Sequence, residues 1–307
     1  MEHLTVQANG AALHVARMGA GRPLLLLHGW PEFWLTWEPV MTRLADRFTL
    51  YAPDLRGFGD SDKPEGLFGP DQQAADMLAL MDALGLAQAG IVGHDVGGAL
   101  MQPLARLVPE RIAGLFFFDF VYPGIGSRMA EPERLNNIWY QSFHQMEMAP
   151  ALVGASRESC RRYIGHFLKA WSHRKHVFDD QLDAFTDNFL KDGNLAGGFA
   201  HYRAAHAGRV RMMKGEAPAL PPIGVPTCVR WAEHDPLFPM NGPTGSAKPL
   251  QISISRCFLV SVTFPIVRTP IAQHQRSRRS LPASAGAKGK GWDRQTRQNT
   301  DGPVPLL

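Results

Sequence analysis

The chain has 307 residues, of which 45% are hydrophobic and 20% are charged, as is ordinary for a soluble protein built on one large α/β domain. No stretch approaches the roughly 18 apolar residues of a membrane span, and the start of the chain has no signal-peptide pattern. The net charge of +4 is uneven, because residues 246–307 carry +8 and the first 245 residues carry −4. The basic balance therefore gives no reason to expect that the main body binds nucleic acid.

Strand and helix signals alternate through the first 125 residues. Apolar runs predict strands at 23–27, 48–52, 89–92 and 112–118, and helical patterns occupy 72–84 and 99–107. Such alternation favours an α/β fold with a mostly parallel, doubly wound sheet. Ligands of such sheets bind beyond the carboxyl ends of the strands, where residues 28–31, 54–60 and 93–98 form polar or glycine-rich turns.

The pattern changes after residue 125. Residues 126–220 are mainly helical in pattern and predict a cap, or lid, inserted between 1–125 and 221–245, which form the two parts of the sheet domain. A strand returns at 227–231. Residues 246–307 form an atypical basic tail that we expect to be poorly ordered, with room for one strand within 251–267.

The most informative motif is a sharp turn between a predicted strand and a predicted helix. It reads Gly93-His94-Asp95-Val96-Gly97, with an aspartate where many nucleophile elbows carry a serine. A carboxylate with an ordinary pKa of about 3.9 is already anionic at neutral pH and needs no base to activate it. Asp95 therefore predicts attack on an electrophilic carbon, as in epoxides and alkyl halides, and an ester on the enzyme.

Four ordered motifs resemble those of α/β-hydrolase-fold proteins of the epoxide hydrolase and haloalkane dehalogenase group. They are the turns at 28–31, 54–61, 93–98 and 231–239. The resemblance implies that Asp95 is the nucleophile and that Asp235 is the acid that orients a base histidine, with Asp119 as a weaker alternative. It also implies that the backbone amides of Trp30 and Val96 form the oxyanion hole. The side chains of His28 and Pro31 are expected at the substrate pocket.

The predicted cap separates the two chemistries within this group. Tyr140 and Tyr202 lie in segments similar to those that supply the two tyrosines of epoxide hydrolases, where the phenols protonate the epoxide oxygen. Many haloalkane dehalogenases place a halide-binding tryptophan after the nucleophile, where this chain has Val96. The sequence therefore predicts an epoxide substrate. A dehalogenase with the same nucleophile remains the alternative enzyme.

The base histidine of the family has no clear counterpart. His274 is the only histidine after Asp235, and its polar, basic surroundings make it a weak candidate. We therefore expect a slow second half-reaction, and we hypothesise that the end of the chain is divergent or read from another frame. The non-enzymatic alternative is a degenerate binding protein. We expect no cofactor, no metal, no nucleic-acid or membrane partner and a cytoplasmic location, the last because three widely spaced cysteines favour a reducing compartment.

Overall fold

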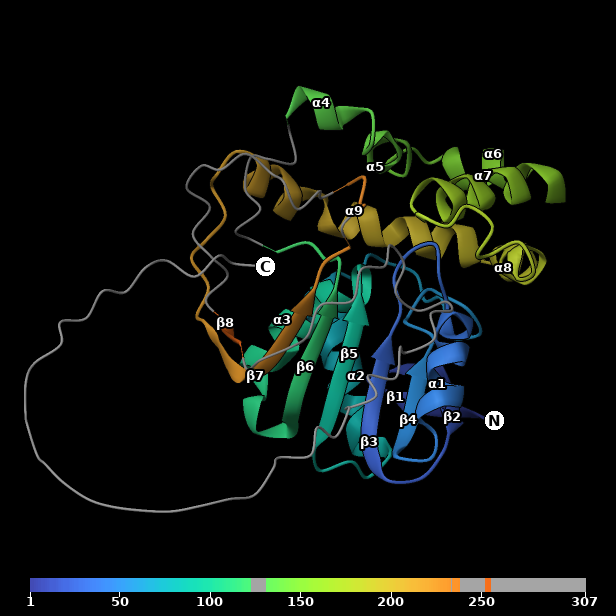
Figure 1. Cartoon of the computed structure of the whole chain (residues 1–307). Helices are drawn as coiled ribbons and strands as arrows, with labels where there is room; N and C mark the ends of the chain where they lie inside the picture. Colours follow the sequence, from blue (N-terminus) through green and yellow to red (C-terminus); the bar gives the residue numbers. More distant parts are fainter. Residues whose placement is uncertain (123–130, 233, 238–251, 255–307) are drawn as a thin grey trace, which may run out of the picture. The chain divides into compact units, whose positions relative to one another are not determined.

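The strands form one sheet, in the order β1-β2-β4-β3-β5-β6-β7-β8 (Figure 1). The computed structural model describes residues 1–122, 131–232, 234–237 and 252–254. Within these residues the strands are β1 Glu2–Ala8, β2 Ala11–Met18, β3 Arg22–Leu27, β4 Phe48–Pro53, β5 Ala89–His94, β6 Ile112–Phe118, β7 Ile223–Arg230 and β8 Ile252–Ile254. Pairing is parallel from β4 through β3, β5, β6 and β7 to β8, which confirms the predicted mostly parallel sheet.

The first two strands were not among the predicted elements. They form an antiparallel hairpin, and β2 also pairs antiparallel with β4. Asn9 and Gly10 connect them with φ angles of 50° and 75°. A two-residue turn of this kind needs positive φ at both positions, which Asn-Gly adopts readily. The dipeptide was therefore a local signal for this hairpin.

Side chains of β3 alternate between the two faces of the sheet and bury both. Leu25 and Leu27 belong to the larger apolar core, whereas Leu26 packs into a second core with Trp37 and Met41. All three leucines are fully buried. Because successive residues of a strand point to opposite faces, a continuous apolar run is what a strand covered on both sides requires. The helices α1 Glu38–Leu44, α2 Pro70–Ala83 and α3 Val96–Leu107 flank this sheet.

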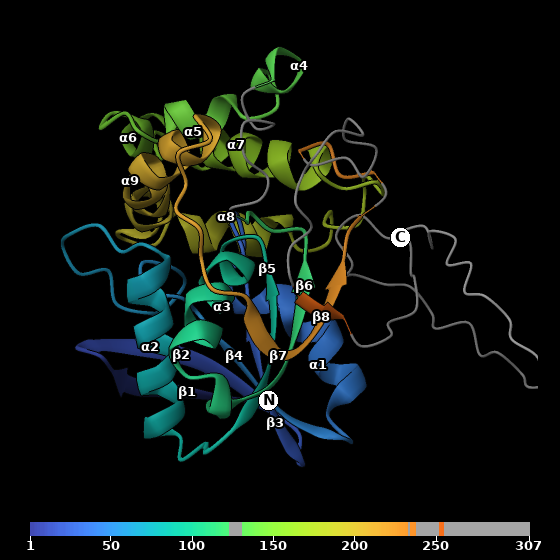
Figure 2. The same cartoon turned by 90° about the vertical axis from the view of Figure 1, so that its left-hand side faces the viewer.

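Residues 132–213 form a run of helices, as predicted for this part of the chain (Figure 2). They are α4 Pro132–Leu135, α5 Trp139–Phe143, α6 Ala149–Val153, α7 Arg157–Ala170, α8 Leu182–Phe189 and α9 Asn194–Met213. Trp30, in the turn after β3, joins them to the sheet. Its ring stacks on Tyr140 at 5.7 Å and meets Phe167 and Tyr202 edge-on at 4.8 Å and 5.6 Å. The helical run thus lies against the carboxyl end of the central strands.

Residues 255–307, which include the weak candidate base His274, lie outside the described residues. The three-residue strand β8 falls within the segment in which the sequence allowed one strand. Over the part of the chain that is described, none of the helices has the length and apolar character needed to cross a membrane.

Candidate active site

Asp95 occupies a strained position at the end of β5, one residue before α3. Its φ and ψ are 48° and −107°, an unusual conformation for a residue with a side chain, at a cost on the order of 1–3 kcal/mol. Close packing around the turn explains its glycines: a Cβ on Gly97 would lie 2.2 Å from the carbonyl oxygen of Leu27, and one on Gly93 would lie 2.2 Å from Sδ of Met101. The sharp turn aims the carboxylate beyond the strand end.

Two backbone amides hold the Asp95 carboxylate. The Trp30 N–H donates to Oδ2 at 3.0 Å, and the Val96 N–H also hydrogen-bonds to this side chain. Burial raises the pKa of Asp95, whereas the charge of His94 and the two amides oppose that rise, and the net result is a pKa above the ordinary value. The structure thus brings together the predicted nucleophile and both predicted oxyanion donors.

A buried ion pair that sequence reasoning missed lies directly behind Asp95. Glu32 is fully buried, and its Oε2 lies 2.9 Å from Nδ1 of His94 and accepts from the Gly29 N–H at 2.8 Å. Thr36 donates to the other carboxylate oxygen at 3.0 Å. Burial disfavours the charged imidazole, but the charge and hydrogen bond of Glu32 outweigh it and raise the pKa of His94 to about 9. A cation therefore sits next to the candidate nucleophile at neutral pH.

Tyr140 and Tyr202 line the same cavity as Asp95. The cavity has a volume of about 820 Å³. The two rings are perpendicular, with centroids 5.5 Å apart, and both residues are buried. Burial raises the pKa of each phenol, and the charge of Asp95 raises it further, so both remain protonated and able to donate. The two predicted tyrosines, which lie on α5 and α9, thus lie side by side in the cavity that also holds the candidate nucleophile.

The two candidate acids lie close to each other at the ends of β6 and β7. Asp235 is buried and accepts from the Leu237 N–H at 2.7 Å, and Asp119 accepts from the Ala232 N–H at 2.7 Å. Burial and the charge of Asp235 raise the pKa of Asp119 to about 7. The weak candidate base His274 lies outside the described residues.

His28 and Pro31 are both buried in the turn after β3. Nδ1 of His28 lies 2.8 Å from the Gly29 carbonyl oxygen, and Nε2 accepts from the Leu55 N–H at 3.0 Å. Burial lowers the pKa of His28, so the ring stays neutral and holds two loops together. Neither His28 nor Pro31 is among the described residues that line the cavity of Asp95, and their role at the substrate pocket stays a prediction.

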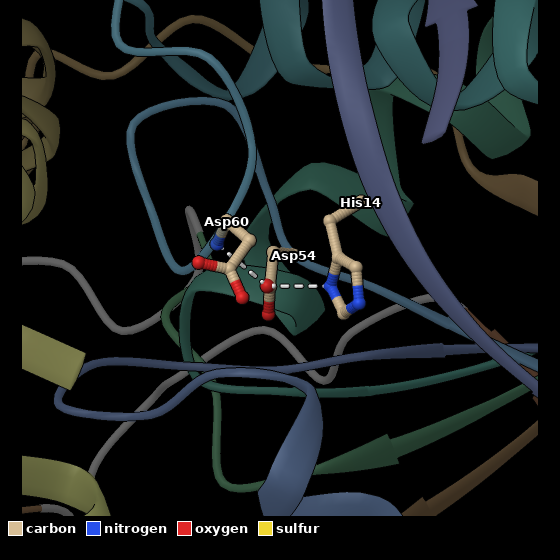
Figure 3. Close-up of side chains that lie close together, drawn as sticks. All are labelled: His14, Asp54 and Asp60. Carbon is tan, nitrogen blue, oxygen red and sulfur yellow. Dashed lines mark hydrogen bonds and ion pairs between the residues drawn. The ribbon is translucent and has the colours of Figure 1, made fainter. Parts of the chain in front are cut away.

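Three possible metal ligands, His14, Asp54 and Asp60, lie together in the described part of the chain (Figure 3). Asp54 is already saturated: Oδ2 lies 2.8 Å from Nδ1 of His14 and accepts from the Asp60 N–H, and Oδ1 accepts from the Trp34 N–H. The Asp60 side chain pairs with Lys191. A metal would have to displace these partners, so the cluster instead stabilises the turn at 54–61 through hydrogen bonds.

Comparison with known proteins places these features in a family. A family model described as alpha/beta hydrolase fold matches residues 22–251. The soluble epoxide hydrolase of Corynebacterium sp. (strain C12) is 34% identical over 186 residues, which are 58% of this chain and 63% of that protein. Epoxide hydrolase 4 of Mus musculus is 27% identical over 244 residues, or 76% of this chain and 66% of that protein.

A solved structure shows the same similarity. An epoxide hydrolase from Vigna radiata aligns with a TM-score of 0.61 and 25% identity, covering 76% of this chain and 80% of that one. The chain thus spans about two thirds of the length of the two curated relatives, 63% and 66%, and 80% of the length of the solved structure.

Proposed function

Because the chain belongs to the α/β hydrolase fold family, we propose that it is an enzyme that opens epoxides through an ester on Asp95. One observation carries the proposal: an elbow aspartate and two buried tyrosines line a single cavity. The curated relatives named as epoxide hydrolases support this substrate class. In this proposal the helices of residues 126–220 act as the cap, which closes the cavity and supplies the phenols.

In the first half-reaction, an oxygen of the Asp95 carboxylate attacks an epoxide carbon and the carbon–oxygen bond of the ring breaks. The leaving oxygen takes a proton from Tyr140 or Tyr202, and water later returns a proton to that phenolate. The product is a hydroxyalkyl ester. The carboxylate oxygen that accepts from the Trp30 amide becomes the ester carbonyl oxygen, already placed in the proposed oxyanion hole.

In the second half-reaction, water adds to the ester carbonyl and the diol leaves. This step needs a base, which is typically worth about 10²–10⁴ in rate. We propose that Asp235 would orient such a base. Because His274 is a weak candidate for it, we expect the ester to accumulate rather than turn over rapidly.

Intact-protein mass spectrometry after incubation with styrene oxide tests the proposal. We expect one adduct of the mass of the epoxide, mapped by peptide digestion to Asp95 and absent from Asp95→Asn. Absence of both adduct and diol would refute the assignment of the nucleophile. Rapid diol formation would instead show that this chain supplies a base. Release of halide from short haloalkanes, without reaction of epoxides, would favour the dehalogenase.

A further inference from the structure

Arg209 is a buried cation in the wall of the candidate active-site cavity. It lies on α9, is only 9% exposed, and lines the cavity together with Asp95 and Tyr202. Its guanidinium carbon is 5.7 Å from the centre of the Tyr202 ring. Burial lowers the pKa of Arg209, but a guanidinium keeps its charge in proteins. A fixed positive charge therefore lines the candidate active-site cavity.

No hydrogen bond or ion pair engages the Arg209 guanidinium among the residues that the structure describes. Arg56, the other buried arginine in this part of the chain, shows the usual arrangement: its guanidinium makes two hydrogen bonds to Asp76, at 2.6 Å and 2.7 Å. Removing a charge from water without a partner is costly, so buried charges are normally paired. The cation–π contact with the ring of Tyr202 offsets only a small part of this desolvation cost. The five donors of Arg209 are thus available for a ligand.

The position of Arg209 along α9 directs it to the same cavity as Tyr202. The two residues are seven positions apart, and because a helix has 3.6 residues per turn, they share one face. Two further arginines, Arg106 and Arg211, also line the cavity, against one acid besides Asp95, Asp71. Arg106 is engaged, since its Nε donates to the Pro221 carbonyl oxygen, and Arg211 is exposed. Among the described residues that line the cavity, Arg209 is the one that combines burial, charge and free donors.

We propose that the substrate is an epoxide with a carboxylate a few carbons from the ring, and that Arg209 binds this carboxylate in a two-pronged pair. The inference rests on the proposed epoxide chemistry and names its substrate class. A planar guanidinium matches a carboxylate with two parallel hydrogen bonds. Because the guanidinium lies over the ring of Tyr202, a short chain suffices to reach from Arg209 to an epoxide oxygen at the two phenols.

The competing role for Arg209 is to act through Tyr202. Its charge lowers the pKa of both phenols, against the larger effect of burial, and so favours proton donation. That role would serve charged and neutral epoxides alike. The two roles therefore differ in one measurable quantity, the preference for an anionic over a neutral substrate of the same shape.

The experiment compares the epoxide of 5-hexenoic acid with the epoxide of its amide, using the rate of adduct formation per substrate concentration. We expect Arg209→Gln to lower the acid-to-amide preference by about tenfold or more, since a hydrogen bond to a charged group is worth about 1.5–3 kcal/mol. The control is Lys214→Gln, which removes one positive charge from an exposed position at the end of the same helix, outside the residues that line the cavity. It should change the preference less than about threefold, because water and salt screen it.

A binding measurement separates failure of this inference from failure of the proposed chemistry. Calorimetric titration with hexanoate and hexanamide needs no reaction at Asp95. We expect hexanoate to bind more tightly than hexanamide to the unmodified protein, and the difference to vanish in Arg209→Gln. An unchanged preference in Arg209→Gln, or an equal loss in Lys214→Gln, would overturn the inference. Hexanoate selectivity without any epoxide adduct or diol would support a carboxylate site and refute the epoxide chemistry.

Discussion

Replacing Glu32 by glutamine tests whether the buried ion pair behind Asp95 stabilises the protein. The substitution keeps the shape of the side chain and an oxygen that can accept from the Gly29 N–H, but it removes the charge that holds His94 protonated. In the variant, His94 loses its hydrogen-bonded counterion while it stays buried, so its pKa should fall and the ring should be less protonated at pH 7. The loss should therefore appear as lower stability with a specific dependence on pH.

The size of the effect follows from the pKa of His94. A rise from 6.5 to about 9 corresponds to about 3 kcal/mol, which is the part of the folding free energy linked to this proton. A raised pKa in the folded state contributes fully below pH 6.5, and the contribution disappears as the pH rises through about 9. For a domain of this size, the loss should lower the melting temperature by about 6–12 °C near pH 6.5.

Thermal unfolding followed by circular dichroism between pH 6 and pH 9.5 measures this difference. The gap between Glu32→Gln and the unmodified protein should be largest at the acid end and shrink toward pH 9.5. Glu158→Gln is the control, because it breaks an exposed pair with Arg162 on α7 and should change the melting temperature little at any pH. A gap that is absent, or that stays constant across the whole range, would refute the reasoning.

Three further sets of substitutions give separate tests. Tyr140→Phe or Tyr202→Phe should slow formation of the Asp95 adduct at least tenfold, and the double variant should nearly abolish it. Mass spectrometry over time measures this rate, and unchanged rates would show that the phenols take no part in the mechanism. Gly97→Ala places a Cβ 2.2 Å from a backbone oxygen and should cost at least about 1–3 kcal/mol in denaturant unfolding, whereas Gly208→Ala, with no atom within 4 Å, should not destabilise. Asp119→Asn should raise the melting temperature at pH 7 and above but not at pH 4, because a carboxyl whose pKa is raised from 3.8 to about 7 by folding destabilises the protein progressively as the pH rises from about 4 to about 7. Equal effects at both pH values would contradict this.

The central sheet was predictable because its strands are buried on both faces. The runs at β3, β5 and β6 are nearly continuous apolar segments, and each ends in a turn whose residues could be recognised. The hairpin β1–β2 could not be predicted from hydrophobic patterns, because β1 is largely exposed and its residues form no apolar run. Exposed edge strands are specified by their turn and by the neighbour they pair with, and neither is visible as hydrophobic periodicity.

The charges around Asp95 could not be predicted from local patterns. Glu32 and His94 are 62 positions apart in the sequence. They meet because β3 and β5 are neighbours in the sheet, and Glu32 lies in the turn after β3 whereas His94 is the last residue of β5. Only knowledge of the strand order brings the two turns together. Arg209 differs, since its spacing of seven residues from Tyr202 was visible once Tyr202 had been chosen. The burial of Arg209 was not visible in the sequence, because charged residues lie on several faces of α9.

The electrostatic coupling between Asp95 and the tyrosines bears on the order of the proposed steps. Before reaction, the Asp95 carboxylate raises the pKa of Tyr140 and Tyr202, so the phenols hold their protons while the epoxide binds. Attack turns that carboxylate into a neutral ester and thereby removes one cause of the raised pKa. The phenol becomes a stronger acid as the epoxide oxygen becomes a stronger base. The pair Glu32–His94 is neutral as a whole, so it does not offset the loss of negative charge at Asp95. In the proposed first step, negative charge therefore moves from Asp95 to the phenols within the same cavity.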